Sequence, residues 1–183
     1  LATAHGIGDD RVTPCQELPD QKSVSRTYTL YRNTDNPTQI KATLRNLCEE
    51  VAWKLRQLNS LARCFGLSIR GEHLSDFQRT TVKNFVADGG EIYDISLSLF
   101  AKMHWSASVR FLGGWASLLN SRFQTPISIF PQDQKKDRVN IAMDSVNNKF
   151  GHLTLYPANM MQNSLVRPEP NGYLGDKKFQ LTT

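Results

Sequence analysis

The sequence has no long hydrophobic run and little cysteine, and these absences narrow the class of protein. No apolar stretch in its 183 residues approaches the roughly 18 residues of a membrane helix, and no secretory signal peptide is recognisable. The three cysteines, Cys15, Cys48 and Cys64, are odd in number and lack metal-site spacing, which indicates reduced thiols. We therefore expect a cytoplasmic protein without a membrane partner.

Catalytic motifs are also missing. There is neither a Walker phosphate loop nor a GxGxxG turn, and the four histidines are scattered without metal-ligand spacing. Neither Ser23 nor Ser25 has a neighbouring base that would make it a nucleophile. In a predicted helix, one or both of Glu49 and Glu50 should face water. We expect no reaction centre, metal or cofactor in this chain.

The charge is concentrated in the middle of the chain. Residues 22–122 hold 14 Lys and Arg against 8 Asp and Glu, whereas the remainder holds 8 against 9. A local basic surplus of this kind is typical of a domain that binds a polyanion.

Hydrophobic periodicity predicts the element order β-α-β-β-α-β. Asn36 and Pro37 fit the N-cap and first position of the first helix, with Gln39 completing a capping box. Strands are expected at 22–30, 63–70, 77–85 and 109–119, and helices at 37–58 and 91–103. This order predicts an α+β fold, a four-stranded antiparallel sheet with both helices on one face and the other face free.

Beyond residue 122 the sequence predicts a tail with one helix. The segment 125–131 is a short apolar peptide between prolines and cannot be helical. A helix is expected at 133–150, with Val139, Met143, Val146 and Phe150 on its apolar side and Gly151 at its end. The predicted division is a lead-in at 1–21, a domain at 22–122 and a tail at 123–183.

Small hydroxyls and cations on the predicted strands suit phosphate binding. Lys22-Ser-Val-Ser-Arg26 offers Ser23 and Ser25 beside two cations, and Arg79, Thr81 and Lys83 share one parity on the third strand. Arg110 is the second residue of the last predicted strand. Such side chains grip phosphate oxygens and read no base sequence.

Four motifs together resemble the C-terminal part of bacterial Y-family (translesion) DNA polymerases, over about residues 6–119. The motifs are Gly6-Ile-Gly-Asp-Asp-Arg-Val-Thr-Pro14, Lys22-Ser-Val-Ser-Arg26, Phe77-Gln-Arg-Thr-Thr81 and Val109-Arg-Phe-Leu-Gly-Gly114. They resemble the end of that family's thumb and three strands of its little-finger domain. The chain departs from the family pattern at Val82, where the family has Arg, and at Gly114, where it usually has a β-branched residue.

The resemblance implies that the open sheet face binds duplex or primer–template DNA. The implied contacts are Lys22, Ser23, Ser25, Arg26, Arg79, Thr81, Lys83 and Arg110. Because the chain begins at Leu1, we expect it to be a fragment of a longer polymerase chain that is its partner. The catalytic carboxylates and their Mg²⁺ would lie in the palm, upstream of Leu1, so the fragment itself should not be an enzyme.

The tail peptide resembles the Gln-Leu-Ser/Asp-Leu-Phe segment of bacterial sliding-clamp ligands. Ile127, Ser128, Ile129 and Phe130 fit that pattern, whereas Pro126 replaces its glutamine. The apolar anchors of such an extended peptide would fill pockets on the clamp.

Two other functions remain open at this point. One is an RNA-recognition module of the same element order, although the Lys/Arg-Gly-Phe-Gly/Ala-Phe pattern is absent. The other is a protein–protein adaptor that uses its tail peptide alone.

Overall fold

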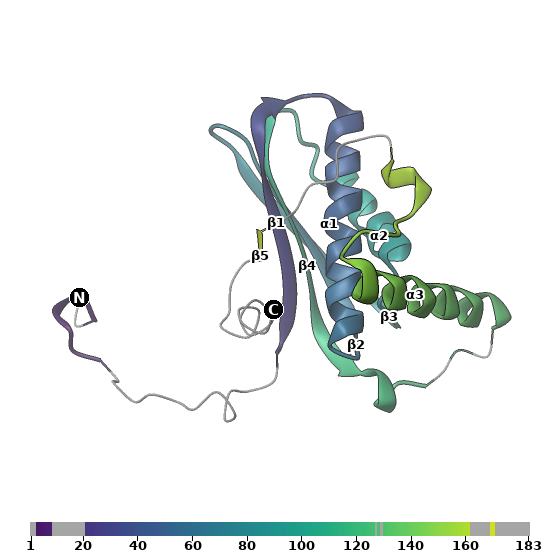
Figure 1. The fold of residues 1–183 in the computed structure, drawn as a ribbon. Coiled ribbons are helices and arrows are strands. Elements are labelled where there is room, and N and C mark those ends of the chain that lie inside the picture. Colours follow the sequence, from purple (N-terminus) through teal and green to yellow (C-terminus); the bar gives the residue numbers. More distant parts are fainter. Residues whose placement is uncertain (1–2, 9–20, 127, 129, 162–168, 171–183) are drawn as a thin grey trace.

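In the computed structural model, helices cover one face of an antiparallel sheet (Figure 1). The structure describes residues 3–8, 21–126, 128, 130–161 and 169–170. Its main elements are β1 (Ser23–Thr34), α1 (Pro37–Gln57), β2 (Ser60–Arg70), β3 (Ser75–Val86), α2 (Gly89–Lys102) and β4 (Val109–Ser121). The predicted α+β fold and its element order are confirmed.

The strands lie in the order β3-β2-β4-β1-β5, and all four neighbouring pairs are antiparallel. The fifth strand, β5 (Glu169–Pro170), was not predicted and pairs with the outer edge of β1. The remaining elements are the short 3₁₀ helices η1 (Thr3–His5), η3 (Arg122–Gln124) and η4 (Ala158–Met160), and the long helix α3 (Pro131–Phe150).

Local sequence signals explain where α1 begins. The Asn36 side chain accepts a hydrogen bond from the Thr38 backbone N–H (2.9 Å), and Pro37 takes the first turn, as predicted. The predicted capping box is wrong in its second half, because the Gln39 amide oxygen instead accepts from the Thr34 hydroxyl (2.9 Å). Gln39 therefore ties the helix to the end of β1.

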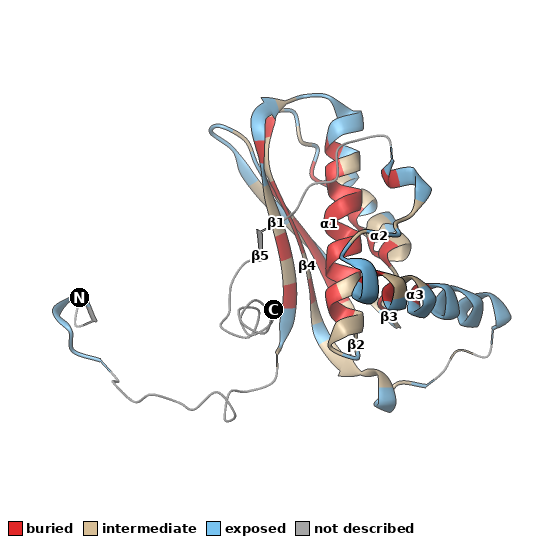
Figure 2. Ribbon diagram, in the orientation of Figure 1, coloured by how far each residue is buried: buried red, intermediate tan, exposed pale blue. Residues whose placement is uncertain are grey.

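The core lies between the sheet and the two helices that cover it (Figure 2). The apolar stripe of α1, including Leu44, Leu47 and Val51, is fully buried against alternate residues of the central strands. Those strand residues include Phe65, Leu67, Ile69, Leu112 and Ala116. Apolar residues recur about every 3.6 residues along the helix and every second residue along the strands. The apolar side chains of α1 and of the strands therefore meet in one core layer.

The expectation that Glu49 or Glu50 faces water is wrong. Both carboxylates are buried, because the side of α1 away from the sheet is covered as well. Glu49 pairs with Arg45 (3.0 Å) and with Arg56 (3.4 Å), and Glu50 contacts the His152 imidazole (2.5 Å). Each buried carboxylate therefore has a partner, as burial in a low dielectric requires.

The docking face of α3 also differs from the prediction. The helix begins at Pro131 and ends before Gly151, whose φ of 111° suits a glycine. Its buried residues are Asn140, Asp144 and Asn147, whereas the apolar Val139 and Phe150 are 57% and 63% exposed. Figure 2 shows most of α3 as exposed.

Polar contacts hold α3 on the helix layer. Asp144 accepts two hydrogen bonds from the Arg56 guanidinium (2.6 and 2.9 Å), and the Asn140 amide donates to Asp88 (3.0 Å). Burial alone would lower the pKa of Arg56, but hydrogen bonding and charge from Asp144, and then Glu49, outweigh it and raise that pKa. Arg56 therefore stays charged, and α3 docks by ion pairing rather than by an apolar face.

Candidate nucleic-acid interface

Cross-strand register aligns four rows of side chains on the sheet face opposite the core. The rows are Ser23–Ser117–Cys64–Thr81, Ser25–Trp115–Gly66–Arg79, Thr27–Gly113–Ser68–Phe77 and Thr29–Phe111–Arg70–Ser75. We call these residues the open face, because the residues that alternate with them point into the core beneath α1 and α2. None of them is acidic, so the face carries only hydroxyl, aromatic, small and cationic groups.

A shallow hollow runs across the middle of the open face. It has a volume of about 340 Å³ and includes the hydroxyls of Ser23, Ser25 and Thr27 on its β1 side. Gly113 forms part of its floor, where a Cβ would come within 2.6 Å of the Ser68 Oγ. Hydroxyls of this kind commonly bind phosphate oxygens.

Two arginines lie on the open face beside this hollow. Arg79, a predicted contact, is exposed on β3 opposite Gly66. Arg70, at the end of β2, was missed by the sequence analysis, although it lies two residues after Ser68 and so shares its parity. Its guanidinium carbon lies 4.1 Å from the centroid of the Phe111 ring, and the residue is exposed. Both cations can therefore reach an anionic ligand on this face.

The structure corrects the placement of Arg26. It alternates with Ser25 and Thr27, pairs opposite Gly114, and is only 6% exposed. Its guanidinium donates to the Ser25 carbonyl (2.8 Å). Arg26 therefore belongs to the other side of β1 and does not share the open face with the two serines.

Arg110 also lies off the rows of the open face. It precedes Phe111 on β4, and its guanidinium donates to the Tyr31 carbonyl (2.5 Å) where the register of β1 is irregular. It therefore supports the irregular end of β1 rather than lining the hollow. Lys22, by contrast, is exposed directly before Ser23 and stands at the entrance to the face.

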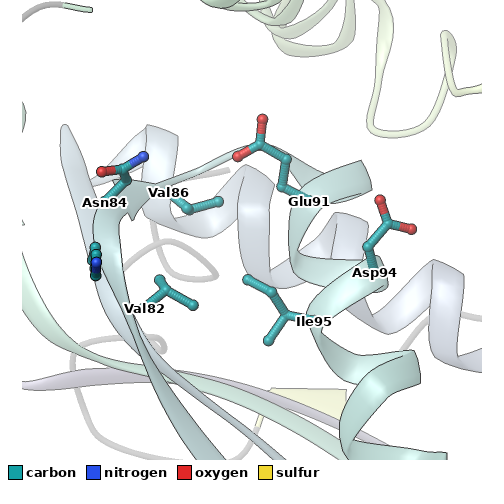
Figure 3. A pocket seen from close by; sticks show the side chains of 7 residues that line it. Val82, Asn84, Val86, Glu91, Asp94 and Ile95 are labelled. Atoms are coloured by element: carbon teal, nitrogen blue, oxygen red, sulfur yellow. The ribbon is translucent and has the colours of Figure 1, made fainter.

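Thr81 and Lys83 are exposed on β3 with the same parity as Arg79, as predicted. Lys83 lies between the Thr81–Cys64 and Val86–Ala62 pairs, where β3 bulges, and borders a second hollow between β3 and α2. Figure 3 shows Val82, Val86 and Ile95 in this second hollow, with the carboxylates of Glu91 and Asp94 beside them. Those carboxylates make it unsuited to phosphate.

Aromatic side chains on the open face were missed by the sequence analysis. Trp115 lies over Gly66, since a Cβ at that position would overlap the indole ring. Phe111 stacks with Arg70 in one row of the open face. Phe77 is 66% exposed in the next row, which separates the row of Phe111 from the row of Trp115. Their parity with Gly113 and Ser68 was the signal that could have placed them.

Comparison with known proteins identifies the domain. A family model described as the impB/mucB/samB family C-terminal domain matches residues 21–126. The chain belongs to this family. The predicted resemblance to the C-terminal part of Y-family polymerases is thereby confirmed.

Curated relatives of this domain are named as DNA polymerases or as DNA-repair proteins. The chain is 26% identical over 163 residues to a DNA polymerase IV of Alkaliphilus oremlandii, covering 81% of the chain and 40% of that protein. It is 29% identical over 153 residues to a putative UV-damage repair protein, UvrX, of Bacillus subtilis, covering 81% and 36%. The chain thus spans well under half the length of these curated relatives.

One solved structure is similar at a lower sequence identity. DinB from Sulfolobus solfataricus matches with a TM-score of 0.44 and 18% identity, covering 52% of this chain and 28% of that chain.

The tail peptide that follows the family domain is only partly described. Ile127 and Ile129 lie outside the described residues. The Ser128 hydroxyl donates to Asp133 (2.6 Å) and accepts from the Phe130 N–H (3.2 Å), so Ser128 helps to begin α3. Phe130, at the N-cap of α3, is 64% exposed.

The described residues contain neither a metal-binding cluster nor a membrane-spanning helix. Within the ranges that the structure describes, no group of three or more His, Cys, Asp or Glu side chains is placed to hold a metal ion. No helix in the same ranges is long and apolar enough to cross a membrane.

Proposed function

We propose that the open face binds the sugar–phosphate backbone of duplex or primer–template DNA without reading its sequence. The observation that carries this proposal is the set of four rows, which joins hydroxyls and exposed arginines and contains no carboxylate. Phosphate contacts of this kind position a duplex and are indifferent to its bases. In a translesion polymerase, such indifference would allow a damaged template to be held.

The cations in this proposal differ from the sequence prediction at three positions, since Arg70 is added and Arg26 and Arg110 are removed. Arg70 and Arg79 face the hollow side of the sheet, with Lys22 and Lys83 at its ends, whereas Arg26 and Arg110 are engaged elsewhere. The parent protein would be a DNA polymerase whose palm lies in a part of the polypeptide outside these 183 residues. We expect this part alone to position DNA and to extend no primer.

The salt dependence of DNA binding tests this proposal. About three to five phosphate contacts predict a slope of log K against log salt of roughly −3 to −4 for duplex DNA. Arg70→Ala and Arg79→Ala should each flatten the slope by about one unit and weaken all sequences alike. The measurement is fluorescence anisotropy of labelled duplexes of different sequence over a range of salt concentrations.

Arg138→Ala is the matched control, because Arg138 is exposed on α3, whose buried side docks on the helix layer. It removes the same charge and should leave the slope unchanged. If Arg138→Ala flattened the slope as much as Arg70→Ala, net charge rather than the open face would govern binding, and the proposal would fail. A change of base preference in either open-face variant would also contradict it.

We further propose that residues 126–130 bind the bacterial sliding clamp. The supporting observation is Phe130, an aromatic side chain 64% exposed beside Pro131 at the start of α3. Phe130→Ala should remove most of a micromolar affinity, since truncating an aromatic anchor costs about 2–4 kcal/mol. Pro126→Gln should tighten binding.

Titration of the clamp with these variants decides between this proposal and self-packing of the peptide. Phe123→Ala is the control, because Phe123 is 88% exposed on η3 and lies outside the peptide. Equal affinities for wild type, Phe130→Ala and Pro126→Gln would show that the peptide does not bind the clamp. A pure adaptor, by contrast, would bind the clamp and no DNA.

A further inference from the structure

Trp115 occupies an unusual place for a large aromatic side chain. It stands on the central strand β4, on the sheet face that no described helix covers, and is only half-buried. Gly66 makes this placement possible, because any side chain at that position would collide with the indole. The glycine lets the indole lie against the neighbouring strand.

Other planar groups surround the same part of the open face. Phe111 lies four residues before Trp115 on β4, about 13–14 Å away along the strand by the rise of extended backbone. The Arg70 guanidinium stacks on Phe111 at 4.1 Å from the ring centroid. Phe77 is 66% exposed in the row of Gly113, which lies between the row of Phe111 and the row of Trp115. Gly113 itself carries no side chain, and the Ser68 hydroxyl and the Phe111 ring lie close to it.

The chemistry of these groups favours a ligand with a flat aromatic surface. Phosphate contacts need hydroxyls and cations, which Ser23, Ser25 and Arg79 already provide, and make no use of ring faces. A base inside a duplex has its own faces covered by its neighbours. An unpaired base offers a π-face, and stacking on aromatic side chains of an open four-stranded sheet is an established mode of single-strand binding.

We propose that Trp115 and its aromatic neighbours stack unpaired bases of single-stranded DNA. The cations Arg70 and Arg79, in the same rows, would neutralise the phosphates on either side of a stacked base. This inference rests on the proposed function in taking DNA as the ligand. It extends that function from the duplex backbone to the unpaired strand beside it.

The experiment compares two probes on the same chain. One is a labelled oligothymidylate of about twelve nucleotides, and the other is a blunt duplex of mixed sequence. Stacking contributes about 1–3 kcal/mol per base, so Trp115→Leu should weaken oligothymidylate binding by roughly 5- to 150-fold. Blunt-duplex binding should weaken by a much smaller factor, because a duplex offers no unpaired base to stack on the indole. Phe123→Leu, which shortens an exposed aromatic on η3, should affect neither probe.

A second measurement does not depend on the stability of the leucine variant. Oligothymidylate should quench the intrinsic tryptophan fluorescence, and Trp115→Phe should abolish that quenching while keeping most of the affinity. The chain's other tryptophans lie on the core side: the Trp53 ring lies against His152, and Trp105 packs on the hydrophobic core, so a ligand on the open face should not quench them. Quenching that persists in Trp115→Phe would overturn the proposal.

The two proposals fail in different ways. The stacking proposal is wrong if Trp115→Leu binds oligothymidylate as tightly as wild type, or if it loses duplex and single-strand affinity in equal proportion. The backbone-binding proposal is wrong if wild type shows no salt-dependent duplex binding, even where single-strand binding still requires Trp115. Circular dichroism of each variant confirms that the compared proteins are folded.

Discussion

Removing Asp144 should undock α3 and destabilise the domain. Arg56 has a side-chain exposure of only 5%, and Asp144 supplies its two shortest hydrogen bonds, at 2.6 and 2.9 Å. Breaking a buried pair typically costs 3–5 kcal/mol, because an uncompensated charge remains. Here Glu49 (3.4 Å) and the Ala87 carbonyl (3.1 Å) stay in contact with Arg56, so we expect about 2–3 kcal/mol for Asp144→Ala.

Urea unfolding measures this loss, and hydrogen exchange locates it. With a typical urea slope, the midpoint should fall by about 1–1.5 M, and amides of α3 should exchange faster than in wild type. Asp137→Ala is the control on the same helix, because it removes an ion pair with Arg122 (2.8 Å) that is open to solvent. The Arg122 side chain is 33% exposed and the Asp137 side chain 54%, so this pair should contribute at most about 1 kcal/mol. Equal losses in the two variants would refute the reasoning that burial, rather than charge number, makes the Arg56–Asp144 pair important.

Three further predictions concern single positions. Gly66→Ala should displace the Trp115 indole, lowering the thermal midpoint by several degrees and the single-strand affinity with it; an unchanged tryptophan emission spectrum would contradict this. Burial acts to raise the pKa of Asp88, but hydrogen bonds from Asn140 and Glu91 outweigh it and lower that pKa. The ionised carboxylate should therefore stabilise the fold above about pH 4, and this stabilisation should be lost as the pH falls further. In Asp88→Asn, the free energy of unfolding should fall less steeply over the same pH range. Burial raises the pKa of the Cys48 thiol to about 12 despite its Ser96 hydrogen bond, so in the folded protein at pH 8 it should resist alkylation, as followed by peptide mass spectrometry.

The fold was predictable because its core follows simple periods. Leu44, Leu47 and Val51 on α1 and Phe65 and Leu67 on β2 have spacings that admit one arrangement of a helix on a sheet, and all five are buried together. The start of α1 was predictable for a similar reason, since its N-cap lies within the local sequence.

The docking of α3 could not be predicted from its own residues. Its apolar residues suggested one face, but Asp144 and Asn140 found partners on α1 and before α2, which are distant in sequence. The ion pair between Arg56 and Asp144 depends on how two distant segments pack together. The spacing of residues within α3 contains no information about that packing.

The site was predicted in part. Ser23, Ser25 and Arg79 lie on the open face as expected, whereas Arg26 was grouped with the serines by motif rather than by parity. Strict alternation along β1 separates Ser25 from Arg26. The same alternation would have added Arg70 to the open face, since it follows Ser68 by two residues.

Titration of isotope-labelled protein with duplex DNA, followed by amide chemical shifts, tests the central claim most directly. The account predicts that shifts concentrate in residues 22–27, 66–70, 79–83 and 113–117 and leave the outer surfaces of α2 and α3 unchanged. Shifts that cluster instead on α2 and α3, with the open face unaffected, would contradict it.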